Sequence, residues 1–222
     1  MRPNLEIRRQ QLTLQAQFAN PVFDLFTELP RLVQHLFRTF AGYNIRLADV
    51  KMDSAAESLG QVNLQMSWPD LATVRLFFER IDLTSVYPPF LGYRDGALVA
   101  DLLDAVVGYS PEISYRAFVV TQEIHGALDL PSRDFLSRFS ATPPTTLGPS
   151  LGSGTVFYFG AGENRLAGSL ALDFSRVVED GLFLKLVVIY DAAQVKPTEI
   201  LTVSRSQLSA LFNEIGLELV GG

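Results

Sequence analysis

The chain has 222 residues, with 18 basic and 24 acidic side chains and a formal net charge of −6. It contains no cysteine, which excludes disulfides, thiol nucleophiles and cysteine-ligated zinc sites. Hydrophobic residues make up 48% of the chain and charged residues only 19%, which predicts a globular protein with a well-filled core. The acidic balance disfavours the nucleic-acid backbone as a partner.

The sequence contains no run of about 18 apolar residues, so we expect no membrane span. The first residues lack the apolar core of a signal peptide, and the cytoplasm is the default location. Because cysteine is absent, redox chemistry gives no information about the compartment.

The first half of the sequence alternates between strand and helix patterns. Polar and apolar side chains alternate over residues 12–18, which predicts a half-buried strand. Apolar residues recur every three or four positions over 29–40, which predicts a helix with Thr27 as its N-cap and Pro30 in its first turn. The other elements expected in this half are strands at 45–52, 62–68 and 74–83 and a helix at 95–106.

Two details of this half define element boundaries. The strand pattern at 74–83 changes its alternation midway, as a β-bulge does, so we predict one bulged strand. Asp95 precedes apolar residues at helical spacing and is predicted to cap the second helix, which Gly108 ends.

The second half follows the same order. It begins with a strand pattern at 113–119, and Pro131 begins a short helix. A loop rich in proline and glycine is expected at 141–154. Ser204 and Gln207 have the spacing of a capping box that opens the last helix. The remaining elements are strands at 156–159, 166–174 and 182–190, and the end of the last helix at Gly216.

We therefore expect an α+β fold built by tandem duplication of a β-α-β-β-β-α unit. Corresponding elements recur at a nearly constant separation, which places the two halves at 1–110 and 111–222. The sheets should be mainly antiparallel, with helices packed on one face, and the two pseudo-symmetric halves should form one compact unit.

The strand at 182–190 is apolar on both faces. Its outward positions include Phe183, Val187 and Ile189, and a strand that is apolar on both faces must be covered on both. The cover is either another part of this chain or a second chain at an interface. These three residues are therefore candidate partner-binding residues.

The outward positions of the first half are uncharged amides and hydroxyls instead. They include Gln15, Gln17, Asn63 and Gln65. Such a face is either an ordinary solvated sheet face or a surface on which amides recognise a polar ligand or a backbone. We include these four amides among the candidate partner-binding residues.

Signals for catalysis are weak. Glu123 and His125 share one face of a strand, and Gly126 would allow another group to approach them closely, so this pair is the only catalytic candidate. His35 lies between arginines on the polar side of its helix and is expected to be solvated. The glycine-rich stretch at 148–155 lacks the lysine of a phosphate-binding loop, so no cofactor is expected.

The second helix carries Asp95, Asp101 and Asp104. No liganding loop accompanies these carboxylates, so we expect a solvated helix face and no metal site.

These observations favour a non-enzymatic protein-binding or assembly subunit that uses its sheet surfaces for self-association or for binding a protein partner. Whether the chain is an enzyme stays open, although the absence of a catalytic constellation argues against it. The order of elements loosely resembles helix-grip folds, in which a sheet wraps a helix and can enclose an apolar ligand. The alternative is therefore a small-ligand-binding protein, or an enzyme of unknown type, with an apolar pocket between helix and sheet.

Overall fold

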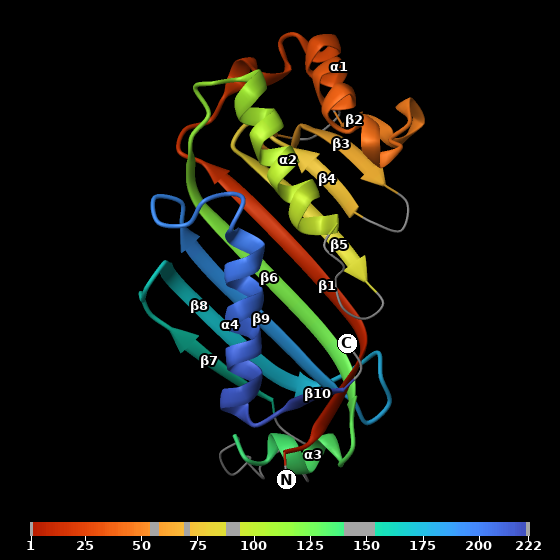
Figure 1. The fold of residues 1–222 in the computed structure, drawn as a ribbon, viewed down its shortest axis with the longest axis vertical. Coiled ribbons are helices and arrows are strands. Elements are labelled where there is room, and N and C mark those ends of the chain that lie inside the picture. The colour runs from red at the N-terminus through yellow and green to blue at the C-terminus, as the bar shows by residue number, and fades with distance from the viewer. Residues whose placement is uncertain (1, 54–57, 69–71, 88–93, 140–153, 221–222) are drawn as a thin grey trace.

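The computed structural model describes residues 2–53, 58–68, 72–87, 94–139 and 154–220. These residues form one α+β unit, in which helices pack on a single ten-stranded open sheet (Figure 1). No helix in the described part of the chain is both long and apolar enough to cross a membrane.

The sheet order is β2-β3-β4-β5-β1-β6-β9-β8-β7, and β10 pairs with β1 off this path. All the pairs are antiparallel except that between β1 and β10. The strands are β1 (Asn4–Phe18), β2 (Val50–Asp53), β3 (Asn63–Trp68), β4 (Ala72–Leu76), β5 (Arg80–Tyr87), β6 (Tyr115–Leu128), β7 (Thr155–Phe159), β8 (Arg165–Phe174), β9 (Leu182–Asp191) and β10 (Glu218–Val220).

The two longest strands, β1 and β6, pair at the centre of the sheet. Their register runs from Leu5 opposite Leu128 to Phe18 opposite Tyr115. Since β1 comes from the first half of the chain and β6 from the second, the two halves share one sheet. Outward from this centre the order is β1-β5-β4-β3-β2 on one side and β6-β9-β8-β7 on the other.

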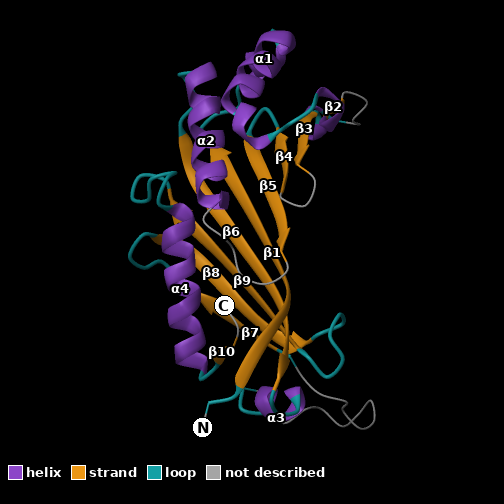
Figure 2. Cartoon of the chain, turned by 45° about the vertical axis from the view of Figure 1, so that its right-hand side comes forward, coloured by secondary structure: helices purple, strands orange, loops and turns teal. Residues whose placement is uncertain are grey.

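The helices α2 (Arg94–Tyr109) and α4 (Ile200–Ile215) lie on the same face of the sheet (Figures 1 and 2). The strands direct their buried apolar side chains toward this face, so that on β9 every second residue from Leu182 to Tyr190 is buried. The helix α1 (Leu29–Thr39) packs beside α2, and the short α3 (Ser132–Leu136) lies at the opposite end of the molecule. The helices and the sheet thus enclose one continuous core.

The predicted bulged strand at 74–83 is wrong. The structure has two strands there, β4 and β5, joined by a tight hairpin in which the backbone N–H of Phe77 donates to the carbonyl of Arg80 at 2.9 Å. The alternation changes because the chain reverses direction between the two strands. The connection at 77–79 is Phe-Phe-Glu, which contains none of the glycine, proline or asparagine residues that predict a turn.

The predicted helix starts also differ from the structure. The helix α1 begins after Glu28 with no side-chain cap, so Thr27 does not cap it, although Pro30 does lie in the first turn. The helix α2 already includes Asp95, which is therefore not its cap. The predicted terminator Gly216 is confirmed, in the left-handed conformation at φ 76°.

Ser204 and Gln207 do not form a capping box, because α4 begins four residues earlier, at Ile200. Both side chains face the sheet instead. The amide Nε2 of Gln122 donates to Ser204 Oγ at 2.7 Å, and the hydroxyl of Tyr190 donates to Gln207 Oε1 at 2.7 Å. These two hydrogen bonds tie α4 to β6 and β9, since buried polar groups need partners.

The position of His35 on the polar side of α1 predicted a solvated side chain, but in the structure His35 is half-buried. Its Nε2 lies 2.9 Å from the carbonyl oxygen of Ala105, and its ring lies 5.7 Å from that of Tyr109. His35 therefore connects α1 to α2. The loop expected at 141–154 lies outside the described residues except for Gly154.

Gly126 allows β1 and β6 to approach each other closely. A Cβ at this position would lie 2.6 Å from Leu5 Cδ1 and 2.8 Å from the carbonyl oxygen of Glu6. We expect Gly126→Ala to lower the free energy of unfolding by about 1–3 kcal/mol, because backbone cannot yield easily to an added methyl group. Urea denaturation measures this change. Gly42→Ala is the matched control, since a Cβ at Gly42 meets nothing within 4 Å, and an equal loss in both variants would contradict the close-approach argument.

Candidate functional site on the uncovered sheet face

One face of the sheet carries α2 and α4, and in neither view does a helix cover the opposite face of β6, β9 and β8 (Figures 1 and 2). The burial of the side chains agrees with this arrangement. On β9 the side chains that face α4 are buried, whereas Phe183, Val187 and Ile189 on the other side are only half-buried. Cover by the chain's own helices, one of the two alternatives for this strand, is therefore not found among the described residues.

Strand register places all seven candidate partner-binding residues on this uncovered face. Side chains directly opposite one another in neighbouring strands share a face, so one row can be followed across the sheet. From β2 to β8 the row contains Lys51, Gln65, Arg75, Asp82, Gln15, Val119, Ile189 and Ala167. The face is thus polar and charged in the first half of the chain and apolar in the second.

The apolar part of this face extends to the free edge of the sheet at β7. There Val156 is 50% exposed and Tyr158 is 83% exposed. We call this surface the apolar patch, and it contains Val119, Val156, Tyr158, Ala167, Ala171, Phe183, Val187 and Ile189. Large contiguous apolar surfaces of this kind mark interaction sites in folded proteins.

Glu123 lies on the same face as the apolar patch and is engaged in an ion pair. Its Oε1 lies 2.7 Å from Nζ of Lys185, the residue directly opposite it on β9. Both side chains are partly exposed, at 28% and 42%. Within the face between β6 and β9 the two charges therefore cancel.

His125 shares this face with Glu123, as the strand pattern predicts, but its hydrogen-bond partner is Ser175. The Nδ1 atom of His125 lies 2.9 Å from Ser175 Oγ, and its ring stacks on Phe183 with centroids 4.8 Å apart. Burial lowers the pKa of His125, the Arg9 cation lowers it further, and Glu123 acts in the opposite direction. The neutral imidazole is therefore the favoured form.

Ser175 was not predicted from the sequence, because it lies 50 residues from His125 along the chain. Its hydroxyl oxygen accepts hydrogen bonds from the backbone N–H groups of Val177 at 3.1 Å and Val178 at 2.9 Å. When it also donates to His125, all of its hydrogen-bonding capacity is used. The arrangement holds the turn after β8, and it leaves no lone pair of the serine free for nucleophilic attack.

The amides of the polar half hydrogen bond with their neighbours. Gln15 Nε2 donates to Asp82 Oδ1 at 3.1 Å, and Gln17 Nε2 donates to Gln15 Oε1 at 3.0 Å. Arg116 extends the network by donating to Gln17 Oε1 at 2.9 Å. Asn63 donates to the carbonyl of Gln61 at 2.9 Å, and Gln65 donates to Ser67 Oγ at 3.2 Å. The charged members of these networks are Asp82 and Arg116, which lie on other strands than the amides. Periodicity within one strand does not predict which residues of another strand lie beside it.

The described carboxylates of α2, those of Asp101 and Asp104, do not form part of a metal site. Asp101 accepts a hydrogen bond from the hydroxyl of Tyr43 at 2.9 Å, and Asp104 is exposed. Across the described residues, no three histidine, aspartate or glutamate side chains are placed to hold a metal ion.

The lowered pKa of His125 predicts a pH-dependent contribution to stability. Below its ordinary pKa of 6.5, the unfolded chain binds a proton more readily than the folded chain, so His125 destabilises the folded state as the pH falls. We expect the free energy of unfolding of the wild type, relative to that of His125→Gln, to decrease between about pH 8 and about pH 5. Urea unfolding at each pH measures the difference. An increase on acidification would instead show that the protonated imidazole is stabilised by Glu123.

No family model, curated protein or solved structure matches the chain.

Proposed function

We propose that this chain is a non-enzymatic assembly subunit whose apolar patch packs against the same patch of a second copy. The observation that carries the proposal is the row of half-buried apolar side chains on β9, Phe183, Val187 and Ile189, for which the described chain supplies no cover. Burying such a row against a partner removes apolar surface from water, at about 25 cal/mol for each Å². Two sheets can stack face to face at a distance of about 10 Å.

The charge of the face favours a second copy as the partner. Each chain carries a net charge of −6, so two copies repel each other at most approaches. In the region between β6 and β9, however, the carboxylate of Glu123 is neutralised by Lys185. A patch that is apolar and locally neutral is complementary to itself, which is the requirement for a two-fold interface.

The amides Gln15 and Gln17 lie on β1, next to β6 and the apolar patch, and we assign them to the polar margin of the interface. Asn63 and Gln65 share the face but lie on β3, beyond β5 and β4, so they are outside this margin. Interfaces of this type combine an apolar centre with a polar rim. The hydrogen bonds that Gln15 and Gln17 make with neighbouring side chains fix their orientation before a partner arrives.

A second candidate function is the binding of a small ligand between α4 and the sheet. A partly open hollow of about 340 Å³ lies there, lined by apolar residues such as Leu186, Val188 and Leu211. Its volume is at the lower end of the range for ligand sites. Arg165 and Glu214 also line it, so a ligand here would need polar groups as well as apolar ones.

We also infer that the two halves arose by duplication of a β-α-β-β-β-α unit. The order of strands outward from the centre supports this, because β1-β5-β4-β3 and β6-β9-β8-β7 correspond position by position, and β2 is then an addition at the edge. Superposing residues 5–110 on 111–222 should align these strands and bring α2 onto α4. A best alignment that matches strands in another order would contradict the duplication.

Self-association is tested by placing a charge in the apolar patch. We expect the wild type to have twice the mass of one chain by light scattering, and Val187→Asp to be a folded monomer. An interface that buries the new carboxylate would lose several kcal/mol. In the monomer this carboxylate stays accessible to water, so the circular dichroism of the variant should match that of the wild type. Its melting temperature should be lower only by the concentration-dependent contribution of the dimer.

Thr202→Asp is the matched control, because Thr202 is exposed on α4, which packs on the other face of the sheet. It adds the same charge and should leave the mass of the dimer unchanged. A monomeric wild type would contradict the proposal. Unfolding of both Val187→Asp and Ile189→Asp would also contradict it, since it would show that the chain itself covers this face.

A further inference from the structure

The polar half of the uncovered face contains a hollow that is lined mainly by polar and charged side chains. It has a volume of about 790 Å³ and lies over β2, β3 and β4, which β5 and β1 separate from the strands of the apolar patch. Three cations, Lys51, Arg75 and Arg80, line it together with one carboxylate, that of Asp53. Among the residues that line the hollow, the cations therefore outnumber the carboxylate, although the whole chain has a net charge of −6.

Among the described residues, two of these cations form no ion pair, and the Asp82 that lies opposite one of them, Arg75, pairs with Arg80 instead. Lys51 and Arg75 lie on either side of Gln65 on neighbouring strands, so their backbones are about 10 Å apart. Arg75 Nε donates to Gln65 Oε1 at 3.1 Å, which orients the guanidinium. In the part of the chain that the structure describes, neither Lys51 nor Arg75 forms an ion pair. Both long side chains can therefore converge on one anionic group.

Arg80 has a different role in the hollow. It forms ion pairs with Glu79 at 2.6 Å and with Asp82 at 3.2 Å, and its guanidinium lies 4.0 Å from the centre of the Phe77 ring. The charge of Arg80 is thus compensated. The Arg80 side chain and the Phe77 ring together form one wall of the hollow. Gln61 also lines the hollow, and its amide can donate to or accept from a ligand without adding charge.

We propose that this hollow binds a small organic anion, whose carboxylate or phosphate group is held by Lys51 and Arg75. Arginine presents several N–H donors to such an oxyanion, and lysine adds a mobile point charge. The volume lies within the range of small-molecule sites. An extended polyanion is disfavoured because the acidic chain would repel the parts of it that lie outside the hollow. Lys51 and Arg75 lie on β2 and β4, outside the apolar patch and its polar margin, so the proposal does not rest on the proposed assembly.

Titration calorimetry of the full chain at low ionic strength tests the proposal, with inorganic phosphate, glycerol 3-phosphate and citrate as the probes. We expect saturable binding of at least one probe, and whether a phosphate or the tricarboxylate binds more tightly identifies the preferred oxyanion. Arg75→Gln and Lys51→Gln should each weaken this binding by about tenfold, since each removes one charge-assisted hydrogen bond.

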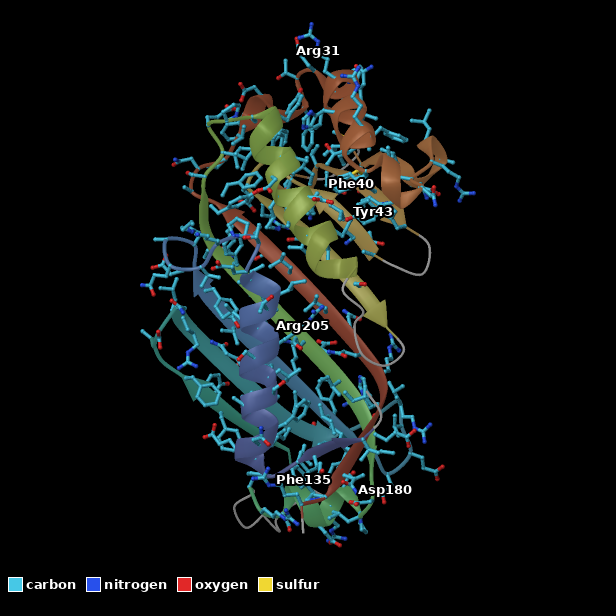
Figure 3. The ribbon with its side chains drawn as sticks, in the orientation of Figure 1. Arg31, Phe40, Tyr43, Phe135, Asp180 and Arg205 are labelled. Atoms are coloured by element: carbon cyan, nitrogen blue, oxygen red, sulfur yellow. The ribbon has the colours of Figure 1, made fainter. Side chains whose placement is uncertain are left out.

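Arg31→Gln is the matched control. Arg31 lies on α1 at one end of the molecule, and its side chain is directed away from the body of the protein (Figure 3). The substitution therefore removes the same charge as Arg75→Gln, but far from the hollow. This variant should bind the anion as the wild type does. Absence of saturable binding for all three probes would overturn the proposal, and so would equal weakening in Arg31→Gln and Arg75→Gln. Lys51 is exposed on the edge strand, so Lys51→Gln keeps the test decisive if Arg75→Gln fails to fold.

Discussion

The pairing of β1 with β6 is the constraint on which the rest of the structure depends. These two strands come from different halves of the chain, and their long antiparallel ladder joins the halves into one sheet. With the ladder in place, β5 and β9 can add only to the outer edges of β1 and β6, and α2 and α4 pack on the same face. The opposite face is consequently one continuous surface that spans both halves.

The two parts of this surface differ because their strands carry different outward residues. Amides and charged groups on β1 to β5 hydrogen bond with each other across the strands, so this part is stable in contact with water. Valine, isoleucine and phenylalanine on β9 have no such partners, and water is a poor solvent for them. A single sheet can thus carry a charged hollow at one end and an apolar patch at the other.

Features set by local periodicity could be predicted from the sequence. The alternation over 12–18 and the apolar spacing over 29–40 each correspond to an observed element, since burial of one face imposes the period. The apolar run over 182–190 also corresponds to a strand. Within a strand, periodicity also predicts that Gln15 and Gln17 share a face. It does not relate Gln15 to Ile189, because the register between strands is set by contacts between distant segments.

The missed features also depend on contacts far apart in the sequence. The first part of β1 was not predicted, because an irregularity between Ile7 and Arg9 breaks its alternation. Ser204 has the residue type of a helix cap, but it bonds to Gln122, 82 residues away. The approach of Ser175 to His125 requires β6, β8 and β9 to be assembled first. The sequence therefore predicts most of the residues on the uncovered sheet face, but it does not predict which of them contact each other.

The parallel pairing of β10 with β1 has a consequence for the order of folding. Asn4, Leu5 and Glu6 pair with Glu218, Leu219 and Val220, so two segments that are distant in the sequence lie side by side. A contact between such distant segments closes a very long loop, and its entropic cost is low only when the chain between them is already folded. β1 and β5 are much closer in the sequence and can pair without this requirement. The parallel closure of β10 on β1 is thus a late step in the folding of this sheet.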